Sequence, residues 1–177
     1  MVAAGASLTG LSLVTIAKEA GVSRNSVYRR WRTKDELYLD VLETVNEPLP
    51  SPAGISTRDD LIMLVRVLAE RVVDNRSSHM LRALNAEAAA FPQLHRRYFD
   101  EIVAPRRAAM NDVLRRGAER GEIRSDVDLN LVSDLLVSPL LARMAQGGTD
   151  QLDPAQASRQ ITDLVLSGAA PAPASPN

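Results

Sequence analysis

The stretch GVSRNSVYRRWRTKDEL, residues 21–37, carries five basic side chains and has no acidic residue before Asp35. Tyr28 and Trp31 lie among the basic residues, which are Arg24, Arg29, Arg30, Arg32 and Lys34. The whole chain of 177 residues has a formal net charge of −1, so this concentration of positive charge is local. Attraction to a polyanion would therefore have to come from this stretch and not from the molecule as a whole.

The residues around this stretch predict two short helices joined by a tight turn. In LSLVTIAKEAGVSRNSVYRRW, the first helix is expected over residues 13–20 and the second over about 24–31. Ser12 and Ser23 are suited to cap the two helices, and Gly21 can adopt the backbone geometry of the turn. The apolar residues expected to pack the helices together are Ile16, Ala17, Ala20, Val22 and Val27. This pattern indicates a helix-turn-helix.

The outward positions of the second helix carry guanidinium, amide, hydroxyl and phenol groups. These positions are Arg24, Asn25, Ser26, Tyr28 and Arg29. Such groups hydrogen bond to base edges and to phosphates in a major groove. An arginine-rich helix alone is more often a solvated face, but the helix-turn-helix spacing around it favours double-stranded DNA as the partner.

The remainder of the chain predicts an all-α protein, because nearly every apolar pattern has a helical period. Thr57 is the expected cap of the first of these helices, and Pro105 is expected to kink the third. The helices are expected over residues 57–75, 79–91, 92–121, 126–148 and 153–168. The stretch NEPLPSPAGIS, rich in proline, predicts a linker ahead of them.

Composition argues against several classes of function. The chain has no cysteine, which removes disulfide and thiolate chemistry and fits a reducing cytosol. His79 and His95 have no carboxylate motif around them, so we expect no metal site and no cofactor. No catalytic constellation can be assembled from the spacing, which argues against an enzyme. No apolar run reaches the ~20 residues of a membrane helix, so we expect a cytoplasmic protein with no membrane partner.

At IAKEAGVSRNSVYRRWRTKDEL, residues 16–37, the sequence resembles the tetracycline-repressor (TetR) family of transcriptional regulators, and the match runs from Gly10 to about Val45. The resemblance implies contacts to bases or nearby phosphates from Arg24, Asn25 and Arg29. It implies contacts to the DNA backbone from Ser26, Tyr28 and Lys34. Trp31, at the family's usual aromatic position, would belong to the core.

The resemblance also implies an architecture. Members of the family have an N-terminal helix-turn-helix DNA-binding domain and a C-terminal helical bundle for ligand binding and dimerisation. Here only Met1 to Thr9 precede Gly10, so the first helix is expected to be truncated, either because the natural start lies ahead of this sequence or because the start is abbreviated in the protein itself. Residues 86–123 look like one C-terminal subgroup of the family. The domains are expected over residues 1–46 for DNA binding, 47–56 for the linker, 57–168 for the bundle and 169–177 for a disordered tail.

Two functions stay open from the sequence. The first is a DNA-binding regulator, a repressor that a small, mainly apolar ligand releases from a palindromic operator. The second is a helical dimer that binds a ligand or a protein without competent DNA binding, because its first helix is incomplete.

A ligand pocket is expected among the central helices and a homodimer interface on the last two. The pocket candidates, each of which fits an ordinary core equally well, are Met63, Val67, His79, Met80, Leu84, Asn85, Phe91, His95, Tyr98 and Met110. The last two helices carry more apolar residues than one core-facing stripe requires, which favours a symmetric partner. These interface candidates are Leu131, Leu135, Leu136, Leu140, Leu141, Ile161, Leu164 and Val165.

Overall fold

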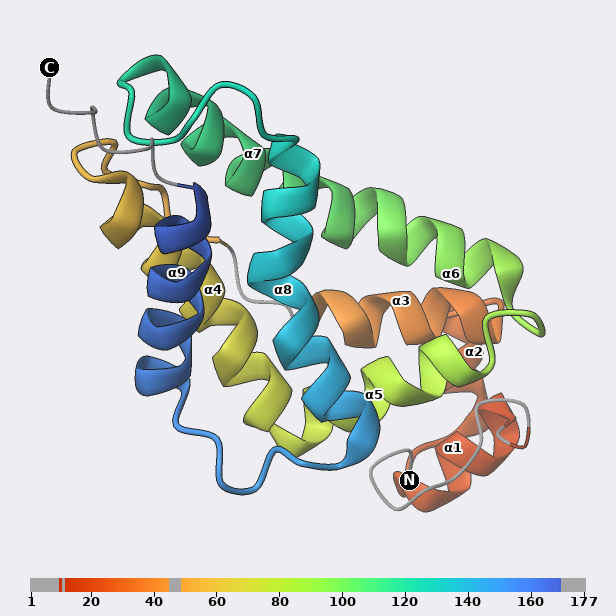
Figure 1. The fold of residues 1–177 in the computed structure, drawn as a ribbon. Coiled ribbons are helices and arrows are strands. Elements are labelled where there is room, and N and C mark those ends of the chain that lie inside the picture. Colours follow the sequence, from red (N-terminus) through yellow and green to blue (C-terminus); the bar gives the residue numbers. More distant parts are fainter. Residues whose placement is uncertain (1–9, 11, 45–48, 170–177) are drawn as a thin grey trace, which may run out of the picture. The chain divides into compact units, whose positions relative to one another are not determined.

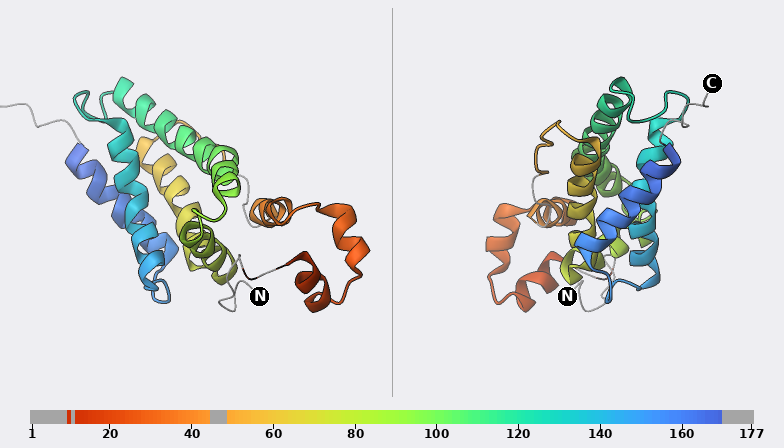
Figure 2. Two further views of the ribbon diagram at one scale, coloured as in Figure 1. Left: turned by 90° about the vertical axis from the view of Figure 1, so that its right-hand side faces the viewer. Right: turned by 60° about the vertical axis from the view of Figure 1, so that its left-hand side comes forward.

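A computed structural model describes residue 10, residues 12–44 and residues 49–169 of the chain. Within these ranges every regular element is a helix, which confirms the expected all-α class (Figure 1, Figure 2). The predicted truncation of the first helix falls on residues 1–9, outside the described ranges. The predicted disordered tail also lies outside them, except for Ala169, which ends the last helix.

The helices form two compact units. The first unit, Met1–Pro48 with Asp74–Ala104, contains α1 (Leu13–Glu19), α2 (Arg24–Arg30), α3 (Lys34–Thr44), α5 (Asn75–Ala86), α6 (Pro92–Tyr98) and the π-helical turn η2 (Phe99–Val103). The second unit, Leu49–Val73 with Pro105–Asn177, contains α4 (Thr57–Val73), nearly all of α7 (Ala104–Glu119), α8 (Leu129–Gln146) and α9 (Pro154–Ala169). The domain boundaries expected from the sequence follow chain order and stay a prediction. The grouping by contacts adds that α5 and α6 belong with the N-terminal helices.

The helix-turn-helix forms as its caps predict. The Thr15 N–H donates to Ser12 Oγ at 3.0 Å, and the Ser26 N–H donates to Ser23 Oγ at 3.1 Å. Each cap satisfies one of the backbone donors that a helix start leaves unpaired. Gly21 turns the chain between the helices with a φ of 66°, in the left-handed region that favours glycine.

A small core holds these helices together. Its buried residues are Leu13, Ala17, Val27 and Leu37, with Ile16 and Trp31 partly buried against them. The packing prediction was wrong for two residues, because Ala20 and Val22 are exposed. The reason is that α1 ends at Glu19, so the helical period no longer applies to the residues of the turn.

The first unit has a second apolar cluster, formed where α3 meets α5, α6 and η2. Its buried members are Tyr38, Leu39, Leu42, Met80, Leu84, Leu94 and Ile102. Burial raises the pKa of the Tyr38 hydroxyl from 10.0 to about 12, and the charges of Glu87 and Asp35 add to this effect. The neutral phenol is therefore the form that this cluster favours.

The middle of the chain departs from the predicted helices in two places. The helix expected over residues 79–91 begins at Asn75, because the Asp74 carboxylate accepts the Ser77 N–H at 2.8 Å, and it ends at Ala86. The long helix expected over 92–121 is interrupted by η2, in which the Ala104 N–H donates to the carbonyl of Phe99, five residues earlier. Pro105 follows directly, and its ring would clash with the carbonyl four residues before it in a regular α-helix. The predicted kink therefore takes the form of a π-helical turn.

In the second unit, α4, α8 and α9 pack side by side (Figure 1). The buried apolar stripe of α4 consists of Leu61, Leu64, Val65, Ala69 and Val72. Ser158 and Thr162 of α9 have no exposed surface, and side chains of this size allow a close approach to α4. Near the start of α4, Arg58 Nε and Nη2 donate to the two carboxylate oxygens of Asp163 in α9, at 2.6 and 2.9 Å.

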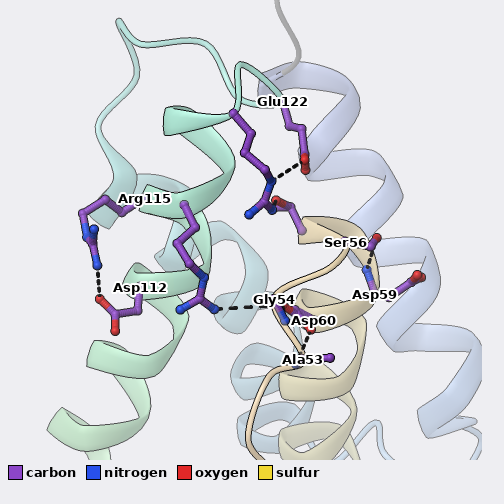
Figure 3. A network of polar contacts seen from close by, with 11 residues as sticks. Ala53, Gly54, Ser56, Asp59, Asp60, Asp112, Arg115 and Glu122 are labelled. Carbon is purple, nitrogen blue, oxygen red and sulfur yellow. Dashed lines mark hydrogen bonds and ion pairs between the residues drawn. The ribbon is translucent and has the colours of Figure 1, made fainter.

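A polar network fixes the loop before α4 (Figure 3). The Asp60 carboxylate, 5% exposed, accepts the N–H groups of Ala53 at 3.0 Å and Gly54 at 2.9 Å. Its Oδ2 also lies 4.0 Å from Nη2 of Arg116 on α7. The predicted cap was wrong by one residue: Ser56 Oγ accepts the Asp59 N–H at 3.2 Å, whereas Thr57 is the buried first residue of α4. The loop is thus attached to the helix that follows it.

Candidate nucleic-acid interface

Helix α2 presents its predicted DNA-contacting face to solvent. Val27 is the buried residue of this helix and holds it on the small core. The five predicted outward residues, Arg24, Asn25, Ser26, Tyr28 and Arg29, are all exposed. Their groups can therefore reach a duplex without any rearrangement of the core.

One of these residues already has a partner. Ser26 Oγ lies 2.8 Å from Ser23 Oγ, the cap of the same helix. A hydroxyl has one donor and two acceptor positions, so this bond leaves Ser26 capacity for two more hydrogen bonds. The predicted phosphate contact of Ser26 would therefore come from a hydroxyl that the helix cap already orients.

Arg30 and Trp31, at the end of α2, are tied to α3. Both the Arg30 guanidinium and the Trp31 ring nitrogen donate to Oδ2 of Asp40, at 3.2 and 3.0 Å. The Arg30 guanidinium also lies 4.9 Å from the centroid of the Trp31 ring. Asp40 was missed by sequence reasoning, because no local pattern links an acid inside α3 to the end of the preceding helix. Asp40 therefore ties the end of α2 to α3.

Lys34 is the first residue of α3 and is half-buried. The start of this helix is fixed on both sides: the Glu36 N–H donates to Thr33 Oγ1 at 3.2 Å, and the Glu36 carboxylate accepts the Arg32 N–H at 2.6 Å. This arrangement closely resembles a capping box, whose signature of threonine followed three residues later by glutamate was readable in the sequence. The Lys34 ammonium lies 5.4 Å from the centroid of the Phe91 ring.

The candidate pocket residues fall into both units. Met63, Val67 and Met110 belong to the second unit, and the other seven belong to the first. Of those seven, Met80 and Leu84 are buried in the apolar cluster, and Phe91 and Tyr98 pack against it. The polar candidates are not part of this cluster: Asn85 is exposed, and His79 Nδ1 lies 2.9 Å from the carbonyl of Asn75 in its own helix. His95 is half-buried on α6.

The candidate dimer residues of α8 and α9 separate into exposed and covered ones. Four leucines are exposed, namely Leu131 at 58%, Leu135 at 51%, Leu141 at 39% and Leu164 at 75%. Ile161 and Val165 are half-buried. Leu136 and Leu140 have no exposed surface, so they belong to the core of the unit and cannot be direct contacts of a partner in this conformation. Between the two helices lies a groove of about 270 Å³, lined in part by Pro139, Ile161 and Leu164.

The described part of the chain offers neither a metal site nor a membrane span. Within it, no three acidic, histidine or cysteine side chains are grouped as metal ligands would be. No helix among the described residues combines the length and the apolar character that crossing a bilayer requires.

Two family models match the chain. The model described as bacterial regulatory proteins of the tetR family matches residues 3–41, and the model described as the tetracyclin repressor-like C-terminal domain matches residues 52–165. Together they cover both the helix-turn-helix and the helices that follow it.

Individual proteins and structures agree with these matches. The chain is 27% identical over 152 residues to the HTH-type transcriptional regulator YdeS of Bacillus subtilis, covering 85% of this chain and 74% of that protein. It is 28% identical over 162 residues to the DNA-binding transcriptional repressor TetR of Mycobacteroides abscessus, covering 88% and 81%. The crystal structure of the TetR family regulator PfmR from Thermus thermophilus aligns with a TM-score of 0.70 at 20% identity, over 90% of each chain. At that identity the likeness shows a shared fold.

Proposed function

Because the chain belongs to the tetracycline-repressor (TetR) family of bacterial DNA-binding transcriptional regulators, which are not enzymes, we propose that it is a repressor that acts on a palindromic operator. We also propose that it works in the cytoplasm as a homodimer and that a small, mainly apolar ligand releases it from DNA. The observation that carries the proposal is α2, whose five predicted contact residues are exposed while Val27 anchors the helix. The similarity to a named repressor supports the direction of regulation.

The DNA-binding part of the proposal is tested with variants of α2, the proposed recognition helix. The wild-type protein first selects its preferred duplex from a randomised pool, and gel-shift titrations then compare the variants on that duplex and on its single-base changes. If Arg29 reads a base, Arg29→Ala costs about 1–3 kcal/mol and relaxes the preference at one position. If Tyr28 holds the backbone, Tyr28→Ala weakens binding evenly across sequences.

Arg66→Ala is the matched control for these variants. Arg66 is an exposed arginine on α4, where it forms an ion pair with Glu70 at 2.8 Å, and its loss should leave DNA binding unchanged. Unchanged binding by both Arg29→Ala and Tyr28→Ala would refute the role of α2. If the wild-type protein itself selects no duplex, a ligand- or protein-binding dimer becomes the better assignment.

The exposed leucines of α8 and α9 support dimerisation through these helices. Large apolar surfaces left exposed on a folded protein often mark sites where a partner binds. Burying one leucine side chain is worth about 1.5–3 kcal/mol, so four of them across a symmetric interface supply a large share of a stable association. The proposal rests on the four exposed leucines with Ile161 and Val165, and no longer includes Leu136 or Leu140.

Sedimentation experiments test the interface. Leu164→Glu places a charge where a partner would cover an apolar side chain, so we expect monomers at micromolar concentration. Ile55→Glu is the control, because Ile55 is 87% exposed but lies on the loop before α4; this variant should remain a dimer. An interface elsewhere is indicated if Leu164→Glu stays dimeric.

For the ligand, the apolar cluster of the first unit supports a mainly apolar molecule bound near α5 and α6. Such a ligand can control DNA affinity only if it binds the DNA-competent and incompetent conformations differently. We propose that it shifts α3 and so changes the separation of the two recognition helices in the dimer. That separation must match successive major-groove faces, which recur every ~34–36 Å along the duplex.

Linkage provides the test of any candidate ligand. An inducer must bind the free protein more tightly than the operator-bound protein, by the same factor by which it weakens operator binding. Calorimetric titrations of the ligand with and without operator measure both affinities. Equal affinities in the two titrations exclude that compound as the inducer.

A further inference from the structure

The ring of Phe91 lies over the charged end of Lys34, although the two residues are far apart in the sequence. The Lys34 Nζ is 5.4 Å from the centroid of the ring. Lys34 begins α3, the helix that follows α2 in the chain, and Phe91 precedes α6 at the end of the turn that follows α5. Both residues belong to the first compact unit. The pair therefore connects the DNA-contacting segment with the α5–α6 segment inside that unit.

Packing on the cluster side fixes the orientation of the ring. The Phe91 ring meets the Tyr38 ring edge to face, with centroids 6.2 Å apart and an interplanar angle of 86°. Phe91 also packs against the cluster that contains Met80 and Leu84. Its backbone is held as well, because its N–H donates to the carbonyl of Glu87 at 3.0 Å. The ring presents a fixed face to Lys34.

The position of Lys34 at a helix start makes this face important. A cation at the N-terminus of a helix faces the positive end of the helix dipole, which disfavours it there. The negative face of an aromatic ring attracts an ammonium group and offsets that effect. This attraction acts on the charge as a whole and needs no hydrogen-bond acceptor on the ring. A lysine side chain on a flexible four-carbon stem also loses less freedom on binding DNA if it is already held.

We propose that Phe91 is a positioning residue for Lys34, holding the ammonium in place to bind a DNA phosphate next to the recognition helix. This inference rests on the proposed function, in which Lys34 contacts the DNA backbone. It also gives the ligand a short route to the DNA contact. A molecule that enters the cluster around Met80 and Leu84 and displaces the Phe91 ring removes the support of Lys34.

The test is a double-mutant cycle on DNA affinity with the full chain. Fluorescence anisotropy measures binding of the duplex selected by the wild-type protein, at several salt concentrations, for Phe91→Leu, Lys34→Met and the double variant. We expect Phe91→Leu to weaken binding about three- to tenfold. We expect it to lower the dependence of log K on log salt toward the value of Lys34→Met, by up to about one. In the Lys34→Met background, Phe91→Leu should have no further effect.

Two further variants separate positioning from simple loss of packing. Phe91→Trp keeps an aromatic face and should retain both the affinity and the salt dependence of the wild type. Leu64→Ala opens a cavity in the core of the second unit, which contains neither Lys34 nor Phe91, so it should lower the unfolding temperature without changing the salt dependence. Unfolding temperatures of all variants are compared at one protein concentration.

The outcomes distinguish failure of this inference from failure of the proposed function. If Lys34→Met weakens binding but Phe91→Leu has the same effect in both backgrounds, Phe91 does not act through Lys34 and the inference is overturned. If Lys34→Met binds DNA as the wild type does, both the inference and the proposed backbone contact of Lys34 are wrong. The proposed role of α2 is then decided separately by Arg29→Ala. If the wild-type protein selects no duplex, the proposed function itself fails.

Discussion

Replacing Gly117 with alanine should destabilise the second unit, although alanine is normally the better helix residue. Gly117 lies in α7 and is buried. A Cβ atom at this position would lie 2.7 Å from Thr57 Oγ1 and 2.9 Å from Thr57 Cγ2, and 3.1 Å from Cδ1 of Ile123. Thr57 cannot easily move away, because it is 2% exposed and its Oγ1 accepts Nη2 of Arg120 at 2.6 Å.

The magnitude follows from two opposing effects. An alanine inside a helix is favoured over glycine by about 1 kcal/mol. Forcing an extra methyl group into a filled site costs about 1–3 kcal/mol, and rotating Thr57 away would weaken its hydrogen bond from a charged donor. We therefore expect Gly117→Ala to lower the free energy of unfolding by up to about 2 kcal/mol.

Gly168→Ala is the matched control. Gly168 is also helical, in α9, but nothing lies within 4 Å of a Cβ atom built there. This variant should gain about 0.5–1 kcal/mol. Urea denaturation followed by circular dichroism, at one protein concentration, measures both variants. Thr57→Ala should remove most of the penalty of Gly117→Ala in the double variant, and a stabilised Gly117→Ala protein would refute the steric reasoning.

Three further changes test other contacts. Asp60→Ala should cost about 1.5–3 kcal/mol, because it removes the buried carboxylate that accepts the N–H groups of Ala53 and Gly54. Hydrogen exchange should become faster at the backbone amides of residues 53–54, and unchanged exchange there would mean that the carboxylate does not hold the loop. The raised pKa of Tyr38 favours the neutral phenol, so the stability from this group is complete below pH 10.0 and is lost as the pH rises toward about 12. Tyr38→Phe should abolish this loss of stability in unfolding experiments. The same variant should lack the last ionisation step in an absorbance titration of the tyrosines. The hydrogen bond from Arg58 lowers the pKa of Asp163, so the stability from this pair is present above the usual Asp pKa of 3.8 and is lost as the pH falls through the lowered pKa. The difference in unfolding free energy between the wild type and Asp163→Asn should therefore vanish in acid. A difference that persists in acid would point to another cause.

The sequence predicted best those features whose causes are local. Ser12 and Ser23 cap the helices that they precede, and Val27 is buried because its neighbours on α2 are polar. The contacts of Asp40 with Trp31 and of Phe91 with Lys34 could not be found in this way, because folding alone brings these residues together. Neither could the sequence show the π-helical turn, since a proline inside a helical pattern predicts an interruption but not its form.

The interface prediction failed in part for a different physical reason. Helix α8 is apolar around much of its circumference, so its leucines look alike in the sequence. Leu136 and Leu140 are covered within the unit, whereas Leu131 and Leu135 are exposed. The packing of α9 and α4 against one side of α8 makes this distinction, and no property of the individual leucines does.

The attachment of the loop to Asp60 sets a rule for building chimeric regulators. A segment that joins two parts of a chain reaches at most about 3.3–3.6 Å per residue. Ala53 and Gly54 are hydrogen bonded to Asp60 of α4, so residues 54–56 do not extend the linker. If the linker is counted up to the start of α4, its maximum length is therefore overestimated by about 10 Å. A DNA-binding segment from another regulator should therefore be fused before residue 53. The linker then keeps its native length, and the loop held by Asp60 stays with α4.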